Sequence, residues 1–158
     1  MKKLLLLPLS VLLFLVGCDD EETTINPSID LAVDSFDFTI EKTSQFEGNI
    51  HFTAVIKNVG DDFRSNDGQQ SIVVSEKPAA GQSITLVNNP FKDLDGGETI
   101  EVKYIHQGWR VSQEFPSSFI VRINFDPDLH IDGNPQNDDS DSGNNSKEIT
   151  GQQINDRF

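Results

Sequence analysis

The stretch FIVRINF at residues 119–125 decides the fold class of this chain. Every second residue from Phe119 to Phe125 is large and apolar, and Arg122 and Asn124 lie between them. A period of two places apolar side chains on one face of a strand and polar ones on the other, whereas an amphipathic helix repeats about every 3.6 residues. The stretch therefore predicts a strand that covers a core with one face and shows Arg122 and Asn124 to solvent.

The same alternation returns along the chain, and long stretches of helical period are absent. Further strands are expected at 31–40, 50–56, 72–74, 84–86, 100–104 and 146–150. In the first of them the apolar phase slips by one residue between Val33 and Phe36, which indicates a bulge or a change of sheet. Asn88-Asn89-Pro90 is expected to end the fourth strand. Short strands separated by turns, about seven in all, predict an all-β antiparallel sandwich of immunoglobulin type, with a small barrel as the alternative.

Four motifs lie at or near the ends of these strands: IKNVGD at 56–61, LDGGET at 94–99, NFDP at 124–127 and the Asn144-Asn145 pair. Asn and Gly reach positive φ at low cost, so 58–60 and Gly96-Gly97 are expected where the chain reverses. Together the motifs resemble the CARDB domain, a cell-adhesion-related bacterial module. The resemblance covers nearly all of residues 29–151 and implies a β-sandwich, with 152–158 as a C-terminal tail. Because its motifs are turn signatures, it says almost nothing about a ligand.

The segment 126–145 departs from that resemblance as an insertion of Asp and Asn residues. Hard oxygen ligands of this kind suit calcium. The candidate ligands are Asp126, Asp128, Asp132, Asp138, Asp139 and Asp141. Their spacing does not fit the twelve-residue calcium loop, since counting from Asp128 puts His130 at the third position and Asp139, not Glu, at the twelfth. A solvated acidic loop is the alternative to a calcium site.

The N-terminal residues have the pattern of a bacterial export signal. Lys2 and Lys3 form a short positive region, and an apolar run follows from Leu4 to Val16. This run is shorter than the roughly 20 residues that cross a bilayer, so residues 1–17 are expected to be a signal peptide rather than a retained membrane anchor.

The four residues LVGC at 15–18 match the lipobox of bacterial lipoproteins. In that family the cysteine thiol receives a lipid, and the chain is cut before the cysteine. Cys18 is the one cysteine of the chain, so we expect lipidation at Cys18 and attachment to a membrane through the N-terminus. A secreted protein with a chance cysteine at the cut site is the alternative.

The acidic run Asp19 to Glu22 follows the cysteine directly. A single Asp at that place resembles an inner-membrane retention signal, whereas a longer acidic cluster resembles a signal for display on the outer surface. We favour the outer membrane and the cell surface. Residues 18–28 would then form the lipidated end and a flexible acidic tether, reaching up to roughly 30 Å at about 3.3 Å per residue.

Charge excludes one class of partner. The chain carries −14 at neutral pH. Loss of Lys2 and Lys3 with the leader would leave 26 acidic against 10 basic residues, a net charge of −16. Nucleic-acid binding needs clustered Lys and Arg to neutralise phosphates, and here the basic residues are scattered. We expect no nucleic-acid partner.

The segment after the expected fifth strand holds Tyr104, His106, Trp109 and Arg110 close together. Aromatic residues with Arg are common in binding hot spots and sugar-stacking platforms, so Tyr104, Trp109 and Arg110 are candidate ligand contacts. A lone Trp in a sandwich is more often part of the core. The three histidines, His51, His106 and His130, are expected at the surface rather than as metal ligands.

No catalytic motif is recognised. The sequence contains no nucleophile elbow, phosphate loop or dinucleotide fingerprint. We therefore expect no enzymatic activity, and no cofactor other than the candidate calcium ion of the 126–145 loop. The first functional hypothesis is a tethered binding or adhesion domain for a protein or a glycan. The second is a structural or accessory subunit of a cell-envelope complex, and an enzyme is a distant third.

Overall fold

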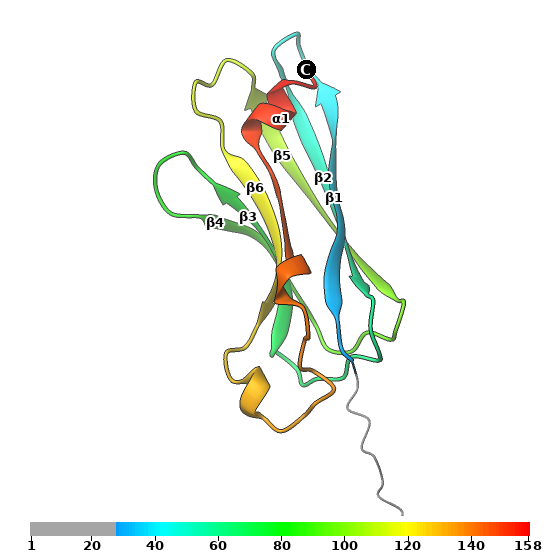
Figure 1. Ribbon diagram of the computed structural model, residues 1–158. Coiled ribbons are helices and arrows are strands. Elements are labelled where there is room, and N and C mark those ends of the chain that lie inside the picture. Colours follow the sequence, from blue (N-terminus) through cyan, green and yellow to red (C-terminus); the bar gives the residue numbers. More distant parts are fainter. Residues whose placement is uncertain (1–27) are drawn as a thin grey trace, which may run out of the picture.

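The computed structural model describes residues 28–158. The expected leader 1–17, the lipidation site Cys18 and the tether residues 19–27 lie outside the described residues. The strands form two antiparallel sheets that face each other (Figure 1), which confirms the all-β sandwich and excludes a closed barrel. The strands are β1 (Leu31–Lys42), β2 (Glu47–Asn58), β3 (Gln70–Lys77), β4 (Ile84–Phe91), β5 (Thr99–Arg110), β6 (Ser118–Phe125) and β7 (Ser146–Ile149).

The first sheet has the strand order β1-β2-β5. The pairing of β1 with β2 shifts register between Val33 and Ser35. This is the bulge that the phase slip predicted, and it keeps Phe36 and Phe38 on the buried face after Leu31 and Val33. An extra residue at a bulge moves every later side chain to the opposite face, which is how one strand can carry two apolar phases.

The second sheet has the strand order β4-β3-β6-β7. The fourth strand therefore pairs with the third, whereas in the constant-type immunoglobulin sandwich it joins the sheet of the first, second and fifth. The expectation that Asn88-Asn89-Pro90 ends β4 is wrong, because Asn88, Asn89 and Pro90 all pair with β3 and the strand runs on to Phe91. Pro lacks an amide hydrogen but is tolerated in an edge strand, where one side of the backbone has no neighbour.

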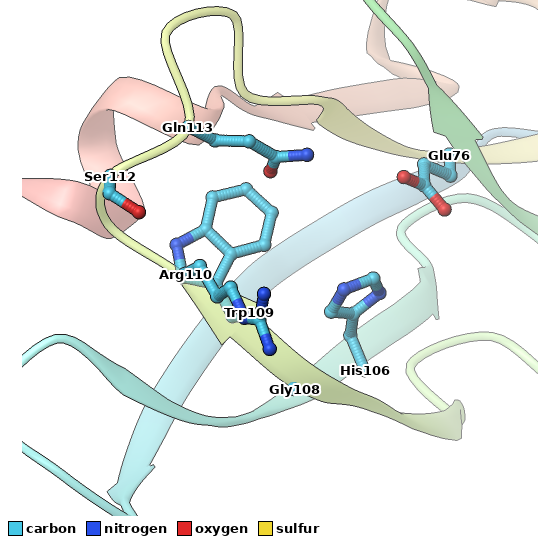
Figure 2. Close-up of a pocket in the computed structure, with 7 residues that line it drawn as sticks. All are labelled: Glu76, His106, Gly108, Trp109, Arg110, Ser112 and Gln113. Carbon is cyan, nitrogen blue, oxygen red and sulfur yellow. The ribbon is translucent and has the colours of Figure 1, made fainter.

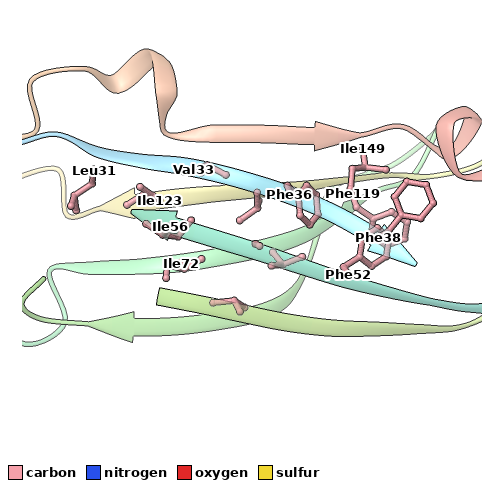
Figure 3. Close-up of a cluster of buried hydrophobic side chains, with 14 of the residues drawn as sticks. Leu31, Val33, Phe36, Phe38, Phe52, Ile56, Ile72, Phe119, Ile123 and Ile149 are labelled. Atoms are coloured by element: carbon pink, nitrogen blue, oxygen red, sulfur yellow. The ribbon is translucent and has the colours of Figure 1, made fainter. Parts of the chain in front are cut away.

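The core lies between the two sheets and consists mainly of aliphatic and Phe side chains on the alternating positions (Figure 3). Its aromatic centre is Phe52, whose ring centroid is 4.4 Å from that of Phe119 and 5.6 Å from that of Phe36. Arg122 and Asn124 are exposed, as the alternation predicted.

Because consecutive strands run in opposite directions, the turns divide between the two ends of the sandwich. The chain enters at Ser28, and the connections 59–69, 92–98 and 126–145 lie at that same end, which we call the entry pole (Figure 1). The connections 43–46, 78–83 and 111–117 lie toward the opposite end, the distal pole.

The expected turns at the entry pole are present, with one difference in their physical reason. Gly97 has a φ of +84°, as expected. Gly60 does not have positive φ; it is required because a Cβ there would lie 2.2 Å from the carbonyl oxygen of Ser28. Asn58 is wholly buried and links the two turns, since its side-chain amide donates to the carbonyls of Asp61 and Leu94.

The C-terminal residues are more ordered than a tail. They form the short helix α1 (Gly151–Asn155), which begins with a capping box between Thr150 and Gln153. Ile154 is completely buried, so α1 closes the core at the distal pole. Across residues 28–158, no helix has the length and apolarity needed to traverse a bilayer.

Candidate functional site

Two polar side chains occupy positions on the core-facing phase at the distal end of the sandwich. Glu76 continues the inward series of Ile72 and Val74 on β3. His106 continues the inward series of Val102 and Tyr104 on β5 in the other sheet. Both are only partly exposed. Apolar side chains normally fill such positions. The carboxylate and the imidazole therefore lie where the apolar core ends and a polar cavity begins.

A bulge in β5 adds Trp109 to this place. The pairing of β2 with β5 shifts register between Gly48 and Ile50, and Gly108 on the bulged strand has a φ of +70°. The amide of Gly108 donates to the side-chain oxygen of Asn49 at 3.3 Å. Since the bulge resets the phase, both His106 and Trp109 point inward although they are three residues apart.

These residues line a pocket of about 360 Å³ at the distal pole (Figure 2). Its floor and walls come from both sheets and from the connection that follows β5. The lining residues are Glu76, His106, Gly108, Trp109, Arg110, Ser112 and Gln113. The lining is mainly polar, which distinguishes it from the apolar pockets that bind most drug-like molecules.

The aromatic residues hold His106 in place. Its ring lies edge-on to Trp109, with centroids 5.6 Å apart, and to Phe119 at 5.3 Å. The indole nitrogen of Trp109 donates to the side-chain oxygen of Asn155 in α1 at 2.9 Å. Helix α1 therefore holds the Trp109 ring in position, and the Trp109 ring in turn packs against His106.

Burial sets the charge state of the pocket. Desolvation lowers the pKa of His106, and the opposing attraction of Glu76 is the smaller effect. At neutral pH the imidazole is therefore neutral, with one nitrogen able to donate and the other to accept. Arg110 lies at the rim, where its Nε atom is 2.9 Å from a carboxylate oxygen of Glu47.

Only two of the three predicted ligand contacts lie at the pocket. Trp109 and Arg110 line the pocket, whereas Tyr104 does not and instead stacks on Phe52 at 6.4 Å. Trp109 is 2% exposed, so it is a core residue whose edge reaches the pocket. The cluster lies within β5 and not after it, because that strand continues through the bulge to Arg110.

Sequence reasoning missed Glu76 and Gln113, and it misjudged His106. His106 was expected at the surface but faces inward and is half-buried. For Glu76 a signal was available, since it stands two residues after Val74 in the apolar phase of its strand. Gln113 lies in an irregular loop, where the sequence offers no periodicity from which to place it.

No family model matches this chain. No curated protein matches it either. Among solved structures, a β-glucosidase from Kluyveromyces marxianus shares 13% identity over 78% of this chain with a TM-score of 0.34. β-Glucosidase 3B from Thermotoga neapolitana, in complex with glycerol, shares 14% identity over 78% of the chain, also with a TM-score of 0.34. The matched part spans only 14% and 16% of those two chains, and a likeness of this size says nothing about activity.

The acidic loop 126–145 lies at the entry pole, at the opposite end of the sandwich from the connection 111–117, which contributes Ser112 and Gln113 to the pocket (Figure 1). It contains the short 3-10 helices η1 (Leu129–Ile131) and η2 (Ser142–Asn144). Four of its carboxylates accept backbone amides two residues onward, in the loop's own turns: Asp126 from Asp128, Asp132 from Asn134, Asp139 from Asp141, and Asp141 from Gly143. This use of short acidic side chains to stabilise turns explains much of the loop's composition without a ligand.

Asp139 fastens this loop to the point where the chain enters the sandwich. Its carboxylate accepts the amide of Leu31 at 3.3 Å and the side-chain amide of Asn145 at 2.5 Å. Its burial raises its pKa. By contrast, the pKa of Asp132 is lowered, chiefly by the hydrogen bond from the side chain of Asn137.

Calcium binding at the loop finds limited support in this geometry. Among residues 28–158, no three His, Cys, Asp or Glu side chains are grouped so that they could hold a metal ion. Asp138 lies 3.2 Å from a ring nitrogen of His130, whereas Asp128 contributes its backbone amide, and not its carboxylate, to the turn with Asp126. The buried side-chain oxygens of Asn137, Asn144 and Asn145 accept no hydrogen bond within the described chain. Calcium therefore stays a prediction.

Proposed function

We propose that this chain is a lipid-anchored protein of the bacterial cell envelope, with a non-catalytic β-sandwich that binds a partner at the cell surface. The single observation that carries the proposal is the separation of the two poles. The chain enters at Ser28 at one end, and the polar pocket lies at the other. The twelve residues of β1 span the distance, about 40 Å at roughly 3.3 Å per residue.

An anchor at Cys18 would therefore attach at the entry pole and leave the pocket pointing outward. The tether of 19–28 adds up to roughly 30 Å when extended. Its acidic residues, like the net charge of the whole chain, disfavour contact with anionic lipid. The LVGC motif at 15–18 supports the anchor, and the turn motifs that resemble the CARDB domain support an adhesion role.

The distal pole also carries exposed apolar side chains beside the pocket. Phe46 is 58% exposed in the β1–β2 connection, and Phe115 is 70% exposed in the β5–β6 connection. The two connections touch, because the amide of Val111 donates to the carbonyl of Phe46 at 3.0 Å. Exposed aromatic residues on neighbouring loops are common in surfaces that bind proteins or glycans.

The anchor is tested by labelling cells with palmitate. We expect label on the wild-type protein and none on Cys18→Ser, which has no thiol to acylate. Gly17→Ala is the matched control, because the lipobox accepts Ala at that position and the label should persist. An unlabelled wild-type protein would refute the envelope assignment.

Protease shaving of intact cells tests the location. Degradation of the domain without lysis indicates the cell surface, and survival until lysis refutes surface display. A pull-down from envelope extracts then separates the two binding roles. A single stoichiometric envelope protein would favour the accessory subunit, whereas glycan capture would favour the adhesin.

A further inference from the structure

We propose that the distal pocket binds one neutral sugar unit, whose hydroxyl groups form hydrogen bonds with Glu76, His106 and Gln113. This inference rests on the proposed binding function and specifies the chemical class of its ligand. It depends on the polar groups that the two sheets bring together in what would otherwise be core.

The two polar side chains on the inner face, Glu76 and His106, have no hydrogen-bond or ion-pair partner among the described residues. Across residues 28–158 the His106 ring has only aromatic neighbours, and its pKa responds to burial and to the charge of Glu76 rather than to any hydrogen bond. Glu76 takes part in none of the ion pairs of the described chain, which join other residues. Half-buried polar groups without protein partners are costly unless something else satisfies them. A ligand rich in hydroxyl groups would do so.

The pocket offers donors and acceptors in a mixture that suits hydroxyl groups, each of which both donates and accepts. The carboxylate of Glu76 accepts, the neutral imidazole of His106 does both, and the side chains of Ser112 and Gln113 do both. Figure 2 shows Gln113 and His106 close to the ring of Trp109, with Glu76 farther out on the side of His106. A ligand with several neighbouring hydroxyls can meet these groups at once.

Charge favours a neutral ligand over an ionic one. The lining contributes one carboxylate, on Glu76, and one guanidinium, on Arg110, so it has no excess of either charge, and Arg110 is itself paired with Glu47. The chain as a whole is strongly acidic, which repels anions from the mouth.

The shape favours a single unit. A volume of about 360 Å³ lies at the lower end of the range for ligand pockets. Trp109 is too buried to offer a full ring face for stacking, so hydrogen bonds must supply most of the affinity. The exposed Phe115 lies in the same connection as Ser112 and Gln113, where it could contact the next unit of a longer glycan.

The test exploits the single tryptophan of the chain, Trp109, which lines the pocket. The full lipidated protein in detergent micelles is titrated with neutral methyl glycosides of glucose, galactose, mannose and N-acetylglucosamine. Glucuronate and glucosamine serve as anionic and cationic counterparts of the same ring. Trp109 emission and titration calorimetry are recorded together, so that binding without a spectral change is still detected.

We expect at least one neutral glycoside to bind saturably and more tightly than both charged sugars. Glu76→Gln removes a charged acceptor and Gln113→Ala removes an amide, and each should weaken binding about tenfold or more. Glu101→Gln is the matched control, because Glu101 is an exposed β5 residue paired with Lys103 and should leave the affinity unchanged.

Two outcomes would overturn the inference. One is tighter binding of glucuronate or glucosamine than of every neutral sugar. The other is the absence of both heat and emission change with all the sugars, in protein whose fold is confirmed by its unfolding curve. If either occurs while envelope extracts still yield a captured partner, the sugar pocket is wrong and the proposed binding function stands. Failure of capture and of palmitate labelling would remove the binding function itself.

Discussion

The buried side chain of Asn58 should be worth more to stability than its size suggests. Its amide donates to the carbonyls of Asp61 at 2.7 Å and Leu94 at 2.8 Å, and its oxygen accepts the amide of Gly60 at 3.0 Å. Asn58→Ala removes all three bonds. At about 1 kcal/mol net for each, and with the Leu94 carbonyl still bonded to Phe63, we expect a loss of about 2–4 kcal/mol.

Asn58→Asp is the sharper test, because Asp has nearly the shape of Asn but cannot donate when ionised. Its carboxylate would face the two carbonyl oxygens at a wholly buried position. We therefore expect Asn58→Asp at pH 7 to be at least as destabilising as Asn58→Ala. Burial would raise the pKa of the new carboxyl, so its folded form binds a proton more readily than its unfolded form. Stability relative to wild type should then recover as the pH falls through that raised pKa.

The assay is urea unfolding followed by Trp109 emission, with the m-value checked for constancy. A loss of 2–4 kcal/mol should lower Tm by roughly 8–16 °C, at about 4 °C per kcal/mol for a domain of this size. Asn66→Asp is the control, because Asn66 is exposed in a turn and should tolerate the change. If Asn58→Asp proves as stable as wild type, the linkage of the two turns through Asn58 is refuted.

Three further variants test the distal pole. Burial lowers the pKa of His106, so wild-type stability should fall as the pH drops below about 6.5; His106→Phe should flatten that fall in urea titrations between pH 5 and 7, and an unchanged slope would contradict this. Gly151→Ala should destabilise by more than 1 kcal/mol, because its Cβ would lie 2.5 Å from Pro116 and 2.6 Å from the Ser117 carbonyl; an unchanged Tm would contradict this close approach. Ile154→Ala should cost about 2–5 kcal/mol by opening a cavity under α1, and Gln152→Ala on the exposed side should not.

Alternation of apolar residues was sufficient to predict the strands, because the two-residue period of side chains along a strand does not depend on which strands pair with it. It placed all seven strands and the bulge after Val33. It failed at Pro90, where the outcome depends on whether the strand lies at an edge or in the middle of a sheet. Strand order follows from long-range pairing, and no local pattern in the sequence records it.

The site was harder to predict than the fold for the same reason. Tyr104, His106 and Trp109 are close in sequence, but their roles differ because a bulge at Gly108 intervenes. The sequence gives no separate signal for that bulge beyond a Gly inside an apolar segment. Glu76 is 30 positions from His106, and only the packing of two sheets brings them to one pocket. An acidic residue in an apolar phase was the one local clue.

The direction of the strands explains why the two conspicuous features of the sequence lie at opposite ends. In an antiparallel sandwich, connections after even-numbered strands return to the end where the first strand begins, and those after odd-numbered strands reach the other end. The loop 126–145 follows β6, so it must lie beside Ser28, where Asp139 binds the amide of Leu31. The segment 111–117 follows β5, so it must lie at the far end with the pocket. A ligand held at the pocket and an anchor at Cys18 would therefore pull along the strands. Such a force would act on the β1–β2 ladder in shear. In that direction the hydrogen bonds of the ladder bear the force together rather than breaking one after another.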